Sequence, residues 1–217
     1  MIVFGELPGP VRELLSALRA ETAGLAVGRR GPGRSDTPFP TSGDLERKLV
    51  PILVRMGFVH HVDLRHPRTG ERFEYDFFHA DFGIAIEVMG YRADDEVYKD
   101  ILKFHVHDAT RVGVVWVPRW KWISKKSTET NFRAALKALA FADSFMHVDA
   151  LVAFAYDWQV GANDRWTLQH IDASAEMAKL EARRAGLREL SRLTQEAGGY
   201  DAELPAGSAL PDEGEDA

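Results

Sequence analysis

The chain has 217 residues, 45% of them apolar, and no cysteine, so it can bury a sizeable core but excludes disulfides, thiolate catalysis and cysteine-based zinc sites. No apolar run approaches the roughly 18 residues of a membrane helix, and the N-terminus lacks a signal-peptide pattern, so we expect a cytoplasmic protein. The net charge of −6 is uneven, because residues 29–137 hold 19 Lys and Arg against 15 Asp and Glu, whereas residues 138–217 hold 6 against 15. This distribution permits a nucleic-acid surface in the middle of the chain.

The N-terminal part of the sequence predicts two helices joined by a loop. Apolar residues recur at helical spacing over residues 8–27, and Pro10 suits the first turn of such a helix. Residues 28–43 are rich in Gly, Pro and Arg, so they form a loop that is either a flexible connector or a phosphate contact. Residues 41–58 begin with capping residues and continue as a second amphipathic helix, which Pro51 kinks or restarts.

The middle of the sequence predicts the core of a sheet. Residues 59–78 alternate around a turn and predict a β-hairpin, and a second tight turn follows at residues 79–81. The continuous apolar run FGIAIEVM, residues 82–89, is typical of a central strand. A helix over residues 93–109 then leads to another buried strand over residues 112–118. Because this order is a strand–helix–strand crossover, we expect the two strands to be parallel neighbours.

The C-terminal part continues with alternating elements. The pattern predicts a helix over residues 128–145 and a strand over 149–158, with residues 165–171 pairing beside that strand as an edge strand. A long charged helix over 172–197 carries an apolar stripe that packs on the domain or on a second subunit. Residues 199–217 contain six acids and no Lys or Arg, and we expect them to be disordered.

Two carboxylates stand out among these elements. Asp76 lies in the second strand of the hairpin and Glu87 near the end of the next strand, eleven residues later, so neighbouring strands can place them side by side. Their mutual repulsion is relieved by a divalent cation, and oxygen ligands suit Mg²⁺, with Mn²⁺ as the other possibility. Glu46, on the preceding helix, could complete the outer shell of that ion; the alternatives are a helix surface acid or a capping partner for Ser42. The alternative is that Asp76 and Glu87 are structural surface acids.

The order of these elements resembles a known nuclease core. The predicted order is a helix with an acid, a strand with Asp, a strand with Glu, a helix and a strand. The part that matches is the stretch YDFFHADFGIAIEVMGYRADDEVYKDILKFHVHDATRVGVVWVP. This order resembles the PD-(D/E)xK, restriction-endonuclease-like nucleases, and is most similar to the branch of type II restriction endonucleases that includes BglII and BstYI. The resemblance covers roughly residues 41–120. It implies an α/β fold with a restriction-endonuclease-like core, in which helices flank a mixed central sheet; the residue pattern adds the C-terminal helix and the acidic tail.

The residue pattern and the resemblance together divide the chain into four parts. Residues 1–40 hold the N-terminal helix and the Gly/Pro/Arg-rich loop, and residues 41–171 form the nuclease-like core. Residues 172–198 form the C-terminal helix, and residues 199–217 form the acidic tail.

The resemblance also assigns roles to single positions. Asp76 and Glu87 match the two metal-ligating acids, Glu46 matches the acid of the first core helix, and the main-chain carbonyl of Val88 falls where the family adds a further metal ligand. Met89 departs from the pattern, because the family has Lys at this position, or Gln in the BglII branch, and a thioether neither donates a proton nor carries charge.

Two explanations of Met89 follow. Lys99 and Lys103 are four residues apart on the next helix and share a face, so one of them can take over the role of the missing lysine, a variation known in the superfamily. The other explanation is that activity is lost and the fold is kept for binding or assembly. The alternative without a catalytic role is that both lysines are ordinary solvated charges that pair with Glu96 and Asp100.

A basic, aromatic segment follows the strand over residues 112–118 directly. It should lie at the same sheet edge as Glu87, where its cations would meet phosphates, although its tryptophans can equally be core or dimer residues beside solvated lysines. Its cationic residues, interleaved with two tryptophans, are Arg119, Lys121, Lys125 and Lys126.

The histidines do not predict a metal site. His60, His61 and His66 are close in sequence, but they should alternate in direction along a strand, and no further ligand accompanies them. His105 and His107 are two residues apart on the predicted helix, so they should point to different sides.

These observations favour a Mg²⁺-dependent endonuclease that acts on double-stranded DNA. Asp76 and Glu87 would hold the metal, Glu46 would orient a water bound to it, and Lys99 or Lys103 would offset charge in the transition state. A palindromic target would call for a homodimer. The competing hypotheses are an inactive nuclease fold that binds nucleic acid or a protein partner, and a structural protein that assembles through its C-terminal helix and tail.

Overall fold

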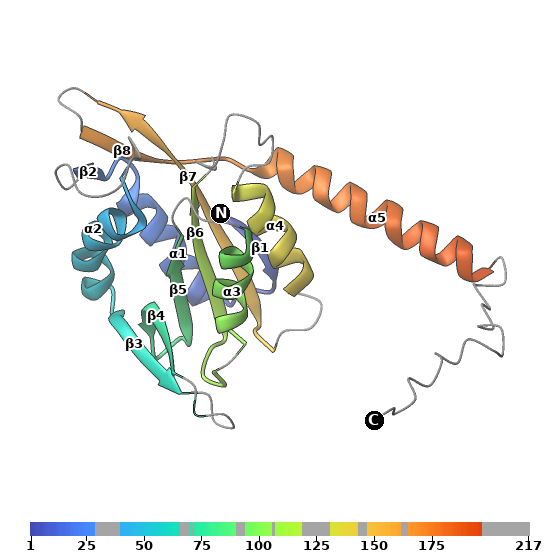
Figure 1. Ribbon diagram of the computed structural model, residues 1–217, viewed down its shortest axis with the longest axis horizontal. Helices are drawn as coiled ribbons and strands as arrows, with labels where there is room; N and C mark the ends of the chain where they lie inside the picture. Colours follow the sequence, from blue (N-terminus) through green and yellow to red (C-terminus); the bar gives the residue numbers. More distant parts are fainter. Residues whose placement is uncertain are drawn as a thin grey trace, which may run out of the picture. The chain divides into compact units, whose positions relative to one another are not determined.

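A sheet with helices on both faces forms the centre of the fold (Figure 1). The computed structural model describes residues 1–28, 40–65, 70, 72–89, 94–105, 107–118, 131–142, 147–161 and 165–196. The elements in these residues are β1 (Ile2–Gly5), α1 (Gly9–Thr22), β2 (Ala26–Gly28), α2 (Ser42–Arg55), β3 (Val59–Arg65), β4 (Arg72–His79), β5 (Ile84–Val88), α3 (Asp94–Lys103), β6 (Val112–Pro118), α4 (Asn131–Ala142), β7 (Ala150–Val160), β8 (Arg165–His170) and α5 (Ser174–Glu196). Met1–Ser174 form one unit, and a second unit begins at Ala175.

The sheet is mixed, with its parallel strands in the centre. Among the described residues the strand order is β2-β8-β7-β6-β5-β4-β3, and β1 also pairs with β7. β5, β6 and β7 are parallel to one another, whereas the other pairings are antiparallel. All residues of β5 and β6 are buried, as expected for parallel strands that are covered on both faces. The predicted hairpin and the predicted parallel pairing across the crossover are therefore confirmed.

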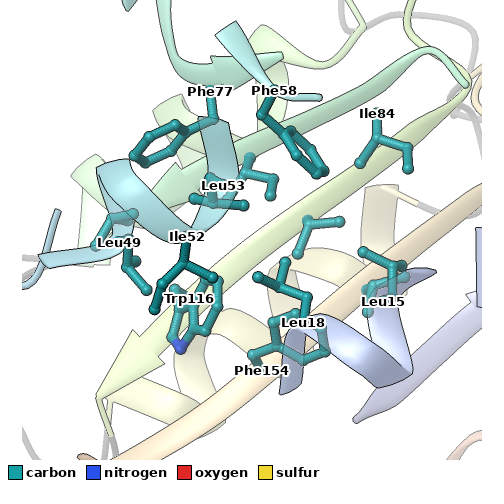
Figure 2. Close-up of a cluster of buried hydrophobic side chains, with 14 of the residues drawn as sticks. Leu15, Leu18, Leu49, Ile52, Leu53, Phe58, Phe77, Ile84, Trp116 and Phe154 are labelled. Carbon is teal, nitrogen blue, oxygen red and sulfur yellow. The ribbon is translucent and has the colours of Figure 1, made fainter. Parts of the chain in front are cut away.

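Helices α1 and α2 cover one face of the sheet, and α3 and α4 contact one another and the other face (Figure 1). Figure 2 shows Leu15 and Leu18 of α1 with Leu49, Ile52 and Leu53 of α2 gathered around two aromatic residues of the sheet, Trp116 and Phe154. The buried side chains of α1 and α2 recur every three or four residues, so each helix turns one stripe of its surface toward the core.

The opposite face of the sheet receives the end of α3. A Cβ atom on Gly113 of β6 would lie 2.3 Å from the ring of Phe104, so the absence of a side chain at Gly113 allows this close packing. Successive residues of a strand point to opposite faces. Ile86 and Val88 of β5 join the apolar cluster under α1 and α2, and Glu87 between them therefore points to the α3 face.

Helix α2 starts with a capping box. The hydroxyl of Thr41 accepts a hydrogen bond from the main-chain N–H of Asp44, and the Asp44 carboxylate accepts one from the N–H of Thr41. The cap is therefore formed by Thr41 and Asp44, and the expectation that Glu46 caps the helix with Ser42 is wrong. The helix also continues through Pro51 as one element instead of restarting there.

The N-terminal region departs from the sequence prediction. The first helix ends at Thr22, because Ala23 is extended and Gly24 has a φ of 73°. The chain then enters β2, which pairs with β8, so β8 is confirmed as the partner of β7 but is not an edge strand. A second unpredicted strand, β1, pairs with β7. Strands of three or four residues are too short to show a periodic pattern, and only their pairing partners define them.

Two further observations complete the fold. Helix α3 ends at Lys103, six residues earlier than predicted. None of the described helices is both long enough and apolar enough to cross a membrane. Residues 199–217 lie outside the described residues, as do most of residues 28–43.

Candidate active site

A cavity of about 350 Å³ lies where the end of β5 meets helices α2 and α3 and strand β4. Its volume is within the range of ligand pockets, but its lining is dominated by polar side chains instead of apolar ones. The fold brings together here all five residues that the sequence analysis proposed for catalysis, and three further charged residues line the same cavity. The five are Glu46, Asp76, Glu87, Lys99 and Lys103, and the three are Arg72, Glu74 and Asp100.

Glu87 is the most deeply buried acid of this cavity, with 2% of its surface exposed. One carboxylate oxygen, Oε2, accepts a hydrogen bond of 2.9 Å from Nζ of Lys103. Among the residues that the structure describes, the other oxygen, Oε1, is buried without a hydrogen-bond partner. Burial, followed by the nearby charge of Asp76, raises the pKa of Glu87 well above its usual value. A buried oxygen of this kind is costly unless a cation or a donor binds it.

Asp76 lies on β4 beside Glu87. Phe77 pairs with Ile86, so the next position of the register sets Asp76 opposite Glu87. The Asp76 carboxylate accepts a 2.6 Å hydrogen bond from the main-chain N–H of Val88, which fixes its orientation. Burial raises the pKa of Asp76 to about 6, although the hydrogen bond from Val88 acts in the opposite direction. The predicted proximity of the two acids is thus present, whereas the role of the Val88 carbonyl as a ligand stays a prediction.

Lys103, the last residue of α3, brings the positive charge into the site. Its side chain is 18% exposed, and its Nζ lies 2.9 Å from Glu87 and 3.0 Å from Asp100. Burial alone would lower the pKa of Lys103, but the charges and hydrogen bonds of Glu87 and Asp100 together outweigh this effect, so the pKa is raised. Lys103 therefore stays cationic at neutral pH. Lys99 also lines the cavity, but it is exposed.

Asp100 is the residue that the sequence analysis considered only as an ion-pair partner. It is 9% exposed and lies three residues before Lys103 on the same helix, so its carboxylate can hold the lysine from one side while Glu87 holds it from the other. The spacing of Asp100 and Lys103 was the available signal. What it did not reveal was that both residues face the cavity.

Met89, at the position where the resemblance would place a lysine, is 2% exposed. Its main-chain N–H donates to the carbonyl of Trp116, and its carbonyl accepts a hydrogen bond from the hydroxyl of Tyr156. Met89 therefore packs inward as part of the sheet, and its thioether belongs to the core.

Glu46 lines the cavity, but its carboxylate also contacts two histidines. Oε1 of Glu46 lies 2.6 Å from Nε2 of His60 and 3.0 Å from Nε2 of His61. The expectation that these histidines point in opposite directions without a further ligand is wrong, because His61 has a φ of 54°, which breaks the alternation of the strand. The third histidine of the sequence cluster, His66, lies outside the described residues.

The predicted nucleic-acid contacts fall on a segment that the structure does not describe. Arg119, Lys121, Lys125 and Lys126 all lie outside the described residues. Their role in binding phosphate stays a prediction.

A protein-family model with the description "Putative halobacteria restriction endonuclease" matches residues 33–156. The match covers more than half of the chain and includes all the charged residues of the cavity. The chain belongs to this restriction-endonuclease family. Its fold is accordingly a restriction-endonuclease-like α/β fold with a mixed sheet. The comparisons with curated proteins and with solved structures gave no match.

Family membership gives the cavity its functional context. The matched segment runs from before α2 into β7 and therefore contains the strands and the two helices that build the site. Buried acids with raised pKa values beside a held lysine are the kind of arrangement that active sites use. The family and the geometry together support a nuclease.

Proposed function

We propose that the protein is a Mg²⁺-dependent endonuclease that hydrolyses phosphodiester bonds in double-stranded DNA at the Asp76–Glu87 cavity. The observation that carries this proposal is the Glu87 carboxylate, which is buried, held by Lys103 on one oxygen and unpartnered among the described residues on the other. Membership of a restriction-endonuclease family supports DNA as the substrate. We also place the protein among the PD-(D/E)xK nucleases, close to the branch of BglII and BstYI.

The donor set of the cavity fits a small divalent cation. Asp76 and Glu87 both supply carboxylate oxygens, and burial raises the pKa of each; at Glu87 the nearby charge of Asp76 adds to this effect. Mg²⁺ prefers such hard oxygen ligands, and Mn²⁺ accepts them too. We propose that the main-chain carbonyl of Val88 is a further ligand. When bound, the ion supplies Lewis acidity toward a phosphoryl oxygen and toward a water molecule.

The protein residues would then act on charge and position. Lys103 carries the positive charge that offsets the negative charge developing on the phosphate, and Asp100 keeps its Nζ beside Glu87. We propose that Lys103 takes the role of the lysine that Met89 replaces in the family pattern. Glu46, at the wall of the same cavity, is placed to orient the attacking water.

The substrate would contact the protein beyond the cavity. We propose that Arg119, Lys121, Lys125 and Lys126 bind the DNA backbone, because they follow β6 directly and β6 is the parallel neighbour of β5. We further propose a homodimer, which would cut both strands of a palindromic site by two-fold symmetry.

A plasmid-nicking assay tests this function. Chelator-treated protein is incubated with supercoiled DNA with Mg²⁺, with Mn²⁺ or with excess chelator, and Glu87→Gln serves as the inactive variant. We expect cleavage by the wild type only with a cation and none by Glu87→Gln. If the wild type cuts none of a varied set of plasmids and genomic DNA, the nuclease proposal fails.

Met89 favours a second candidate, a nuclease fold that binds DNA without cutting it, because the usual lysine is absent from position 89. DNA binding in a gel-shift assay that is equal in the wild type and Glu87→Gln, without cleavage by either, would support this candidate. The position of Lys103 argues against this second candidate, because its ammonium group already lies 2.9 Å from the Glu87 carboxylate.

A further inference from the structure

Two imidazoles and one carboxylate converge beside the candidate active site. Nε2 of His60 and Nε2 of His61 approach the same oxygen, Oε1 of Glu46, at 2.6 and 3.0 Å. One ligand atom from each of the three residues lies within 4.8 Å of the other two. The side chains of Glu46 and His60 are only 17% and 29% exposed, so the cluster is partly shielded from water.

The backbone adopts an uncommon conformation to bring the histidines together. Consecutive strand residues normally point to opposite faces, but the rings of His60 and His61 are only 3.8 Å apart between centroids. His61 reaches this position with a φ of 54°, in the left-handed region that residues other than glycine seldom adopt. Such local strain is concentrated at functional sites.

Neighbouring residues hold both rings in place. Nδ1 of His61 is 2.7 Å from a carboxylate oxygen of Glu74, and the ring of His60 packs against Phe77 at a centroid distance of 4.9 Å. A carboxylate on the far nitrogen of a ligating histidine is the usual outer partner in metal sites, where it fixes the ring and leaves the other nitrogen free for the metal. Glu74 takes this position for His61.

We propose that Glu46, His60 and His61 bind one Zn²⁺ ion through a carboxylate oxygen and two Nε2 atoms, with Glu74 orienting His61. Two histidines and one carboxylate, with a further position open, are a common ligand set of zinc sites that keep an exchangeable ligand. In tetrahedral coordination with bonds of about 2.0–2.1 Å, ligand atoms lie about 3.3 Å apart, so small side-chain rotations accommodate the ion.

This site differs in chemistry from the Asp76–Glu87 pair and goes beyond the proposed nuclease function. Imidazole nitrogen favours Zn²⁺ over Mg²⁺, whereas the pair offers only oxygen ligands. The two sites are nevertheless adjacent, because the residues on either side of His61 pair with the residues on either side of Asp76 in the β3–β4 register, and Glu46 lines the active-site cavity. A zinc ion at this site would keep one position open for water or a phosphate oxygen.

Zinc binding to the full-length protein tests the proposal without any measurement of cleavage. Chelator-stripped protein is titrated with Zn²⁺ against a chromophoric chelator, in saturating Mg²⁺ so that the oxygen site is occupied. We expect one Zn²⁺ per chain. His60→Ala and His61→Asn should each weaken binding by at least about 100-fold, because loss of an outer partner alone costs 10- to 100-fold. Asn is chosen at position 61 because it tolerates the left-handed conformation.

Matched controls separate this site from adventitious binding. His107→Ala removes a histidine outside the cluster, and Asp76→Asn removes an acid of the oxygen site, so both variants should keep wild-type Zn²⁺ affinity. X-ray absorption at the zinc edge should show two imidazole ligands in the wild type. Far-UV circular dichroism and thermal melts establish that each variant is folded.

Three results would overturn the proposal. The first is wild-type protein that binds no Zn²⁺ in saturating Mg²⁺. The second is affinity that stays unchanged in folded His60→Ala and His61→Asn, and the third is affinity that disappears in Asp76→Asn instead. A plasmid-nicking result of either kind leaves these outcomes unchanged, so failure of the nuclease function and failure of the zinc site are distinguishable.

Discussion

Strand β5 presents apolar side chains to one face of the sheet and a carboxylate to the other. Ile84, Ile86 and Val88 join the cluster beneath α1 and α2, where burial of apolar surface stabilises the fold. Glu87, between them, is just as inaccessible but carries an ionisable group whose pKa burial raises well above its usual value. The alternation of one strand thus separates a stabilising face from a face that costs stability and supports chemistry.

The largest expected effect is on the cleavage rate, and it comes from removing the carboxylate charge on the face of β5 that carries Glu87. Glu87→Gln should lower the cleavage rate by at least about 1000-fold, because loss of a metal ligand removes several kcal/mol of Lewis-acid stabilisation. Single-turnover cleavage in Mg²⁺ measures the rate. A folded Glu87→Gln variant that cuts at more than a tenth of the wild-type rate would contradict the assignment.

The matching change on the apolar face should affect stability and leave the chemistry intact. Ile86 is fully buried, and Ile86→Ala should lower the free energy of unfolding by about 2–5 kcal/mol, through lost burial and the remaining cavity. Urea denaturation measures this loss. The cleavage rate of the folded fraction at low temperature should stay near the wild-type value, and a large loss there would show that the two faces are coupled.

A comparison of variants at Lys103 and Lys99 tests which lysine of α3 acts in the site. Lys103→Met should lower the cleavage rate by about 100-fold, because it removes a charge that stabilises the transition state. Lys99→Met removes the same charge from an exposed position of the same helix and should change the rate only a few-fold. Equal losses in both variants would contradict the selection of Lys103.

Asp76 should be a residue whose ionisation destabilises the metal-free protein. Its folded pKa of about 6 lies above the ordinary 3.8, so the penalty is fully present above pH 6 and vanishes as the pH falls toward 3.8. Asp76→Asn should therefore stabilise the protein by about 2 kcal/mol at pH 7.5 in chelator. Thermal melts should show that this gain shrinks below pH 6 and when Mg²⁺ is added. A destabilised variant at pH 7.5 would contradict the prediction.

His170 lies on the apolar face, and we expect it to have the smallest effect on stability. Its pH dependence has the opposite sign to that of Asp76. It contacts Trp116 and Phe154, and burial lowers its pKa from 6.5 to about 4. The unfolded chain therefore binds the proton first, so stability is complete above pH 6.5 and falls as the pH drops toward 4. We expect a loss of about 1–2 kcal/mol, discounted for partial solvent screening. Urea melts at pH 7 and pH 5 should show a smaller pH dependence in His170→Gln than in the wild type.

The candidate site was largely accessible to sequence reasoning where the chain is locally constrained. The short turn between β4 and β5 allows little freedom, so the spacing of Asp76 and Glu87 was enough to predict their proximity. The choice between Lys99 and Lys103 was not accessible in the same way. The two lysines share a helix face, and only the packing of α3 against the sheet decides which of them reaches Glu87.

The histidine cluster and the N-terminal strands escaped prediction for a different reason. Period-two alternation predicts opposite directions for His60 and His61, and the left-handed backbone at His61 overrides that rule locally. β1 and β2 are too short to show any period, and their hydrogen-bond partners lie more than a hundred residues away in the chain.

The sequence alone determined the order of the core elements, the continuous apolar strands at the centre of the sheet, and the two acids that the turn between β4 and β5 brings together. Each of these depends on interactions between residues close in the chain. The tertiary structure decided which lysine meets Glu87, where Glu46 points and how two adjacent histidines share one carboxylate. These features depend on contacts between distant elements, which local residue patterns do not encode.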